Sequence, residues 1–79
     1  MKNITPRVKK DLARLLRKTH TKRGPLKSDM AALGVITEEY HEVMTAIRKG
    51  DRARIRAEML DLANGAIRWV LANDAEAKR

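Results

Sequence analysis

Two short acidic segments combine residue types and spacing that can hold a metal ion. The first is EEYHE, residues 38–42, and the second is EMLD, residues 58–61. Each contains two carboxylates three residues apart, and such residues are neighbours on the surface of an α-helix. The four carboxylates belong to Glu39, Glu42, Glu58 and Asp61, with Glu38 at the edge of the group.

The two segments are arranged symmetrically about Gly50. Glu42 and Glu58 stand eight residues before and after this glycine, and Glu39 and Asp61 stand eleven residues before and after it. If the chain reverses at Gly50, two antiparallel helices bring Glu42 level with Glu58, and Glu39 level with Asp61. Their rotational offsets place both pairs on the same side of the two helices. The sequence therefore predicts one surface that carries four carboxylates.

A hard divalent cation is the partner that such a surface favours. Clustered carboxylates raise one another's pKa values, and a bound cation removes the repulsion. Ligation by oxygen alone selects Mg²⁺, Mn²⁺ or Ca²⁺ over zinc or copper, and Mg²⁺ completes its shell with water and substrate phosphates. Such an ion can also activate water for attack on a phosphoanhydride. The alternative is an ordinary solvated surface, balanced by nearby arginines: Arg52, Arg54 and Arg56.

Three helices and no strand account for the pattern of the whole chain, so the predicted fold class is all-α. Thr5 and Ser28 are the expected N-terminal caps of the first two helices, and Gly50 is the expected end of the second. Its short connection to the third predicts an antiparallel hairpin of helices two and three. The expected helix ranges are about 6–20, 29–49 and 52–73.

The apolar residues recur at helical spacing, and we expect them to form the core. In the second helix they are Met30, Leu33, Ile36, Tyr40, Val43, Met44 and Ile47. A chain of this size buries only about 60% of its unfolded surface, and small domains usually need a partner or a staple. With 79 residues and no cysteine, this single domain has no disulfide to help it. The prediction is a homodimer or homotetramer with a helical-bundle architecture.

Positive charge is concentrated in the first third of the chain. The net charge is +8, and residues 1–27 hold ten Lys or Arg against one acid, Asp11. Such a field favours anionic partners, including nucleic acid bound through the basic first helix. Lys22 and Arg23, expected in a loop before the acidic hairpin, are candidates for binding phosphates.

The composition gives no sign of a membrane or secretory protein. No apolar run approaches the ~20 residues of a membrane span, and the N-terminal residues lack the apolar stretch of a signal peptide. The absence of cysteine agrees with a reducing compartment. We expect a cytoplasmic protein that has no membrane partner.

The acidic segments resemble the EExxE…ExxD signature of the MazG-like, all-α nucleoside triphosphate pyrophosphohydrolases. The resemblance extends from about residue 22 to residue 72, and its matching acids are Glu38, Glu39, Glu42, Glu58 and Asp61. It implies a single MazG-like helical domain over residues 1–79. It also implies self-association, since family members assemble as dimers or as tetramers built from dimers.

The activity implied by the resemblance is Mg²⁺-dependent hydrolysis of (d)NTP to (d)NMP and pyrophosphate. The implied metal ligands are Glu39, Glu42, Glu58 and Asp61. Glu38 and Glu39 are the expected catalytic residues, with Glu38 assisting at a second ion or positioning the water. Two other functions stay open: a non-catalytic basic helical protein that binds nucleic acid, and a structural oligomer without the chemistry.

Three further residues are candidates for contacts. Tyr40 lies on the apolar stripe and is expected in the core. Trp69 lies beside its stripe, where it can stack on a base or make a subunit contact. Asn64 follows Asp61 by almost one turn and can hydrogen-bond a ligand or an acid.

Overall fold

The computed structural model describes residues 3–77, and within this range the chain forms three α-helices and no strand. The helices are α1 (Pro6–Arg23), α2 (Asp29–Lys49) and α3 (Arg52–Ala77). The prediction of an all-α chain with three helices is confirmed. α1 continues three residues beyond the predicted end at residue 20, and α3 continues four residues beyond residue 73. No helix in the described range is long and apolar enough to cross a membrane.

Side-chain caps define where the first two helices begin. The Thr5 hydroxyl accepts a hydrogen bond from the Val8 N–H at 3.3 Å, and Pro6 occupies the first turn. The Ser28 hydroxyl accepts from the Ala31 N–H at 3.2 Å. Each bond satisfies an amide that has no partner within its own helix.

Two glycines with positive φ define where α1 and α2 end. Gly24 has φ 74° and its N–H donates to the His20 carbonyl at 2.8 Å; Gly50 has the left-handed φ of 73°. Such φ values strain any residue with a side chain. Because α1 ends only at Gly24, Lys22 and Arg23 lie in its last helical turn. The prediction that these two residues belong to a loop is wrong.

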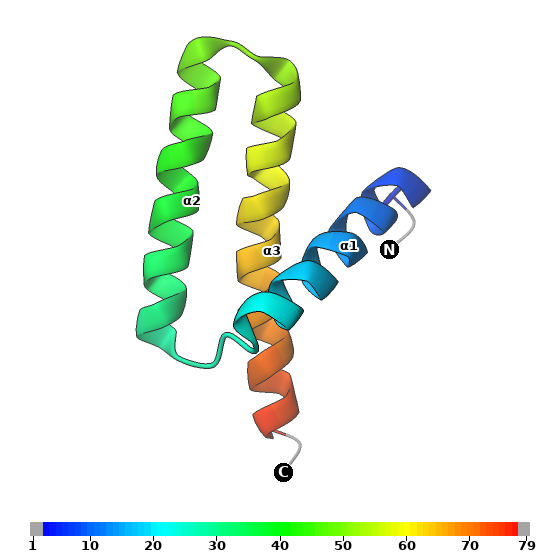
Figure 1. Cartoon of the computed structure of the whole chain (residues 1–79), viewed down its shortest axis with the longest axis vertical. Coiled ribbons are helices and arrows are strands. Elements are labelled where there is room, and N and C mark those ends of the chain that lie inside the picture. Colours follow the sequence, from blue (N-terminus) through cyan, green and yellow to red (C-terminus); the bar gives the residue numbers. More distant parts are fainter. Residues whose placement is uncertain (1–2, 78–79) are drawn as a thin grey trace.

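Helices α2 and α3 lie side by side and run in opposite directions from the tight connection at Gly50 (Figure 1). Val43 and Ala46 of α2 are buried. At Gly65 of α3, an added Cβ would stand 3.0 Å from Val35 Cγ1 of α2. The absence of a side chain at this position lets the two helices come together.

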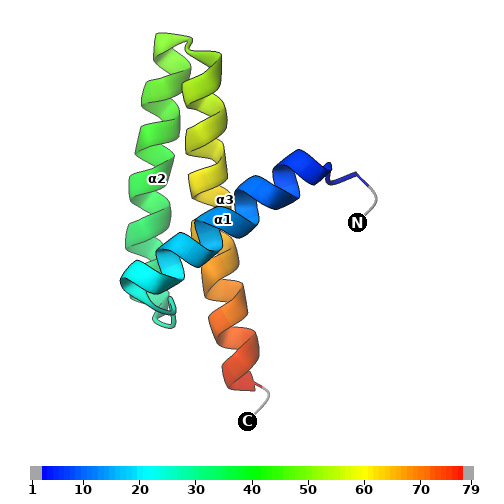
Figure 2. The same ribbon diagram turned by 45° about the vertical axis from the view of Figure 1, so that its right-hand side comes forward.

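Helix α1 crosses α3, and its N-terminal half extends away from the α2–α3 pair (Figures 1 and 2). An ion pair between Arg56 Nη1 and Asp11 Oδ2, at 2.9 Å, joins the two helices. Leu26, in the connection from α1 to α2, is buried with 6% of its surface exposed. In the C-terminal half of α1, the Thr19 hydroxyl accepts a hydrogen bond from Asn64 Nδ2 of α3 at 3.0 Å, which holds this half over α3.

Much of the apolar stripe of α2 is exposed, so the prediction that it forms the core is wrong. Met30, Leu33, Tyr40 and Ile47 are 74, 58, 54 and 52% exposed. A single neighbouring helix covers only one side of a stripe this wide. Leu33 also lines a groove of about 480 Å³ between α2 and α3. We call the surface formed by these four residues and this groove the back face.

Apolar side chains of α3 are also more exposed than the predicted core requires. Met59 and Val70 are each 45% exposed, and no large side chain among the described residues is fully buried. The buried apolar residues are Leu26, Val43, Ala46 and Ala72. The core of one chain is therefore small, as its length predicts.

Candidate metal centre and phosphate cleft

Three of the predicted metal ligands meet between α2 and α3. Glu39 from α2, and Glu58 and Asp61 from α3, each place one carboxylate oxygen within 4.8 Å of the other two. Oxygen ligands on opposite sides of one hard cation are about 4 to 5 Å apart, which is twice the metal–oxygen distance. Small side-chain movements that bring these oxygens closer would let one cation contact all three. We call Glu39, Glu58 and Asp61 the acid cluster.

The environment of Glu39 raises the pKa of its carboxyl group strongly. Partial burial is the main cause that raises its pKa to about 7, and the negative charges of Glu42, Asp61 and Glu58 raise it further. Near neutral pH, the protein without a cation therefore holds a proton on Glu39 about half of the time. A cation at the acid cluster would favour the ionised form.

Glu58 is the most buried acid, with 6% of its surface exposed. Its pKa is raised first by the adjacent Glu42 carboxyl, with which it shares a hydrogen bond when one of the two is protonated, and then by burial. Arg54 opposes this shift through an ion pair of 3.2 Å to Glu58 Oε1. Burial is also the first cause that raises the pKa of Asp61.

Glu42 and Glu38 lie beside the acid cluster. Both side chains are exposed. Glu42 acts on all three members, since its charge raises the pKa values of Glu39, Glu58 and Asp61. Glu38 lines the same cleft as Glu39 and Asp61. The structure thus brings three of the four predicted ligands within 4.8 Å of one another and places Glu42 next to them at the surface.

Buried oxygens without hydrogen-bond partners indicate that the acid cluster fits a cation. They are Glu39 Oε2, Glu58 Oε2 and the amide Oδ1 of Asn64, which is itself only 7% exposed. An unpaired buried oxygen is costly, and metal coordination is one way to satisfy it. Carboxylate and amide oxygens are ligands that Mg²⁺ and Ca²⁺ accept.

Two members of the acid cluster, Glu39 and Asp61, line a cleft of about 250 Å³ between all three helices. Glu38, Glu39 and Asp61 contribute its carboxylates. The cationic residues that line the same cleft are Lys18, Lys22, Arg23 and Arg68. We refer to this space as the cleft. It combines groups that can hold a divalent cation with groups that can hold anions.

Lys22 and Arg23, the predicted phosphate-binding residues, both line the cleft. Lys18, predicted only as a cation of the basic first helix, and Arg68, which was not predicted, line it too. Lys18 precedes Lys22 by four residues, so the two share one side of a helix. This pairing was not predicted, because the predicted first helix stopped at residue 20 and left Lys22 in a loop. Arg68 carries no local pattern, since its place in the cleft depends on how α1 crosses α3.

Arg68 is a partly buried cation whose donors are incompletely used. Its Nη2 donates to the Gly24 carbonyl at 3.2 Å, while its buried Nε has no hydrogen-bond partner. Burial lowers its pKa, and the nearby Arg23 lowers it further. Within residues 3–77, no carboxylate forms an ion pair with the Arg68 guanidinium. Such an environment favours an anionic ligand.

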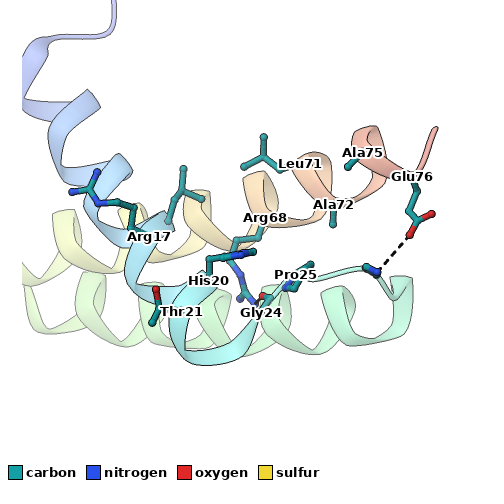
Figure 3. A pocket seen from close by; sticks show the side chains of 12 residues that line it. Arg17, His20, Thr21, Gly24, Pro25, Arg68, Leu71, Ala72, Ala75 and Glu76 are labelled. Carbon is teal, nitrogen blue, oxygen red and sulfur yellow. Dashed lines mark hydrogen bonds and ion pairs between the residues drawn. The ribbon is translucent and has the colours of Figure 1, made fainter. Parts of the chain in front are cut away.

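A second, larger cavity of about 610 Å³ lies on the other side of α1 (Figure 3). His20 and Leu71 line it, and Figure 3 shows the Arg68 side chain reaching toward Gly24 at its base. Arg68 is the one residue that lines both this cavity and the cleft. The acid cluster does not line this second cavity.

Neither of the two aromatic residues faces the cleft. Tyr40 is 54% exposed on the back face, so the prediction of a core position is wrong. Trp69 donates a hydrogen bond from Nε1 to Asp29 Oδ1 at 2.9 Å and lines the groove of the back face. The position of Trp69 agrees better with a contact to another chain than with a base stacked at the acid cluster.

No protein-family model, curated protein or solved structure matches this chain.

Proposed function

We propose that this protein hydrolyses nucleoside triphosphates to a monophosphate and pyrophosphate, with Mg²⁺ held by the acid cluster. The observation that supports the proposal is the cleft itself. Two carboxylates of the acid cluster, those of Glu39 and Asp61, line this space of about 250 Å³ together with four cationic residues. A metal-bound polyphosphate needs both kinds of group, because the cation neutralises only part of its charge.

The proposed metal ligands are Glu39, Glu58 and Asp61, with Glu42 close enough to join them after a side-chain rotation. Mg²⁺ supplies charge stabilisation at the phosphoryl oxygens and lowers the pKa of bound water, and Mn²⁺ can do the same. Asn64 offers an amide oxygen beside the carboxylates. These residues hold the cation and thereby orient the substrate.

Glu38 is the proposed group that positions the attacking water. It lines the cleft next to Glu39 while its carboxylate stays exposed to solvent. The water oxygen forms a bond to the α-phosphorus, and the bond from that phosphorus to the α–β bridging oxygen breaks, with its electron pair left on pyrophosphate. The protons of the water pass to solvent. The positive charges of Lys22 and Arg23 stabilise the negative charge that develops on the departing pyrophosphate.

Arg54 is the main argument for the simpler interpretation of a solvated acidic surface. It pairs with Glu58 Oε1 at 3.2 Å, but its own side chain is 67% exposed. Solvent screens the exposed arginine end of this pair, although Glu58 itself is buried. The pair also leaves Glu39 Oε2 and Glu58 Oε2 without partners. A cation accounts for these two atoms, and Arg54 does not.

We also propose that a second copy of the chain covers the back face. Met30, Leu33, Tyr40 and Ile47 recur at intervals of three and seven residues along α2, which is the spacing of a helix-packing seam. Contiguous exposed apolar surface of this kind marks an interaction site. Homodimers or homotetramers built this way would bury the side chains that one chain cannot cover.

The decisive experiment is a panel of (d)NTPs with Mg²⁺ or Mn²⁺, with pyrophosphate release as the readout. We expect Mg²⁺-dependent turnover that Glu39→Gln and Asp61→Asn each reduce at least about 100-fold. Asp74→Asn, an exposed acid of α3 outside the cleft, is the matched control and should retain activity. Absence of turnover across the panel, together with a melting temperature that Mg²⁺ does not change, would refute the proposal.

Nucleic-acid binding is the second candidate, because α1 presents a series of exposed cations. They are Arg7, Lys9, Lys10, Arg14, Arg17 and Lys18. The N-terminal half of the helix extends away from the rest of the chain (Figure 2). Affinity that falls steeply with salt and does not change in Asp61→Asn would support this candidate. A flat salt response would argue against it.

A further inference from the structure

The cleft has groups for a chain of phosphates but no space or rings for a nucleobase. We infer that the protein recognises its ligand by the polyphosphate chain alone, and that it binds triphosphates of every base, and inorganic tripolyphosphate, with similar affinity. The inference rests on the proposed function, because it specifies which part of the substrate the proposed site contacts. Three features of the structure support it.

The first feature is the distribution of charge across the cleft. Glu39 and Asp61 stand on α2 and α3, whereas Lys18 and Lys22 approach from α1. The charge of Lys18 already acts on Asp61, since it lowers the pKa that burial raises. A polyphosphate fits between the two walls, because one side contacts the cation of the acid cluster and the other contacts ammonium groups.

The second feature is Arg68 at the inner end of the cleft. Its Nε is buried without a hydrogen-bond partner, and burial lowers its pKa. A partly buried guanidinium is well suited to bind the oxygens of a phosphate. Arg68 therefore provides a further anion-binding group beside the exposed lysines of the cleft.

The third feature is the small size and the lining of the cleft. Its volume is about 250 Å³, which is below the range of about 300 to 1,000 Å³ typical of pockets that enclose a whole small ligand. Its lining contains no aromatic ring and no histidine, and both aromatic residues of the sequence, Tyr40 and Trp69, lie elsewhere in the described structure. A base attached to phosphates in the cleft would therefore have no ring to stack on within it.

The larger cavity does not provide a base pocket for the same ligand. The cleft is lined by residues 15, 18, 19 and 22 of α1 and by Arg23 at its end, and the larger cavity by residues 16, 17, 20 and 21. The two sets of four residues lie on opposite sides of the helix. Arg68, the residue common to both cavities, bonds the Gly24 carbonyl at the end of α1 (Figure 3). The body of α1 thus separates the two spaces.

The test is calorimetric titration of the full chain with Mg²⁺ and, in turn, ATP, GTP, CTP, UTP, dTTP and inorganic tripolyphosphate, with AMP for comparison. We expect dissociation constants within about threefold across the triphosphates and tripolyphosphate, and about tenfold or more weaker binding of AMP. A preference of about tenfold or more for one base would overturn the inference, and so would failure of tripolyphosphate to bind.

Turnover measured on the same panel separates this inference from the proposed function. Uniform binding without hydrolysis would support the inference and refute the hydrolase. Hydrolysis of one preferred nucleotide would support the hydrolase and refute the inference.

Substitution of a cleft lysine provides an independent control. Lys18→Gln should weaken tripolyphosphate binding about threefold or more. Lys10→Gln removes the same charge from an exposed position of α1 outside the cleft, and should have a smaller effect. Equal effects of the two substitutions would show that general charge, and not the cleft, binds the polyphosphate, which would overturn the inference.

Discussion

Asn64 of α3 donates a hydrogen bond from Nδ2 to the Thr19 hydroxyl of α1 at 3.0 Å, while its Oδ1 lines the cleft without a partner. One buried amide therefore joins the helix that carries the cations to the helix that carries two of the three clustered acids. Thr19 in turn donates to the Leu15 carbonyl at 2.6 Å, which fixes the rotamer of its hydroxyl. The position of α1 over the cleft depends on this chain of bonds.

Thr19→Val tests that dependence, because valine keeps the shape of threonine and removes the acceptor. Asn64 is then left with an unsatisfied buried N–H, which should lower the free energy of unfolding by about 1 to 3 kcal/mol. Urea denaturation is the measurement. Thr21→Val, at an exposed position of the same helix, is the control and should change stability by less than about 0.5 kcal/mol. Equal effects would mean that the Asn64–Thr19 bond contributes nothing.

Gly65→Ala tests the close approach of α2 and α3. The new Cβ would stand 3.0 Å from Val35 Cγ1, so the helices must separate slightly or Val35 must move. Gly34→Ala is the matched control, because no atom lies within 4 Å of its added Cβ, and alanine favours a helix by about 1 kcal/mol. We expect Gly34→Ala to raise the melting temperature by several degrees, roughly 4 to 8 °C. Gly65→Ala should fall short of that gain or lower the melting temperature.

The pKa of Glu39 predicts how stability depends on pH without a metal ion. Its folded-state pKa is about 7 against an ordinary value of 4.5. Between these values the folded chain binds more protons than the unfolded chain, so the free energy of unfolding should fall as pH rises. Denaturation in a chelator at pH 5 and pH 7.5 measures this change. Glu39→Gln should flatten the dependence, and excess Mg²⁺ should reverse part of the loss at the higher pH.

Leu33→Glu tests whether a second copy covers the back face. A buried, unpaired carboxylate at that interface should shift the chain toward the monomer in sedimentation velocity at micromolar concentration. Leu71→Glu is the control, since Leu71 is similarly exposed at 56% but lines the larger cavity instead. A wild-type chain that sediments as a monomer would rule out the interface outright.

Local signals in the sequence were sufficient to predict the helices and the proximity of the acids. Thr5 and Ser28 form the predicted caps, and Gly50 ends α2 with the left-handed φ expected of it. The equal spacing of Glu39 and Asp61 from Gly50 anticipated that their carboxylates would approach each other. These features depend on a few neighbouring residues and on one reversal of the chain.

Features that depend on the angle between helices were not predictable in the same way. The exposure of Tyr40 depends on how much of the α2 stripe one neighbour can cover, and periodicity does not contain that information. The place of Arg68 in the cleft depends on where α1 crosses α3. Burial of Glu58 with an unpaired oxygen also arises only from packing in three dimensions.

Gly65 lines both the cleft and the groove of the back face, and the side chains of Val35 in the cleft and Ile36 in the groove lie beside it. A neighbour docked in the groove would therefore contact residues that are packed directly against the lining of the cleft. Self-association and catalytic activity would then be coupled. Dilution alone would lower the specific activity, which would rise with protein concentration.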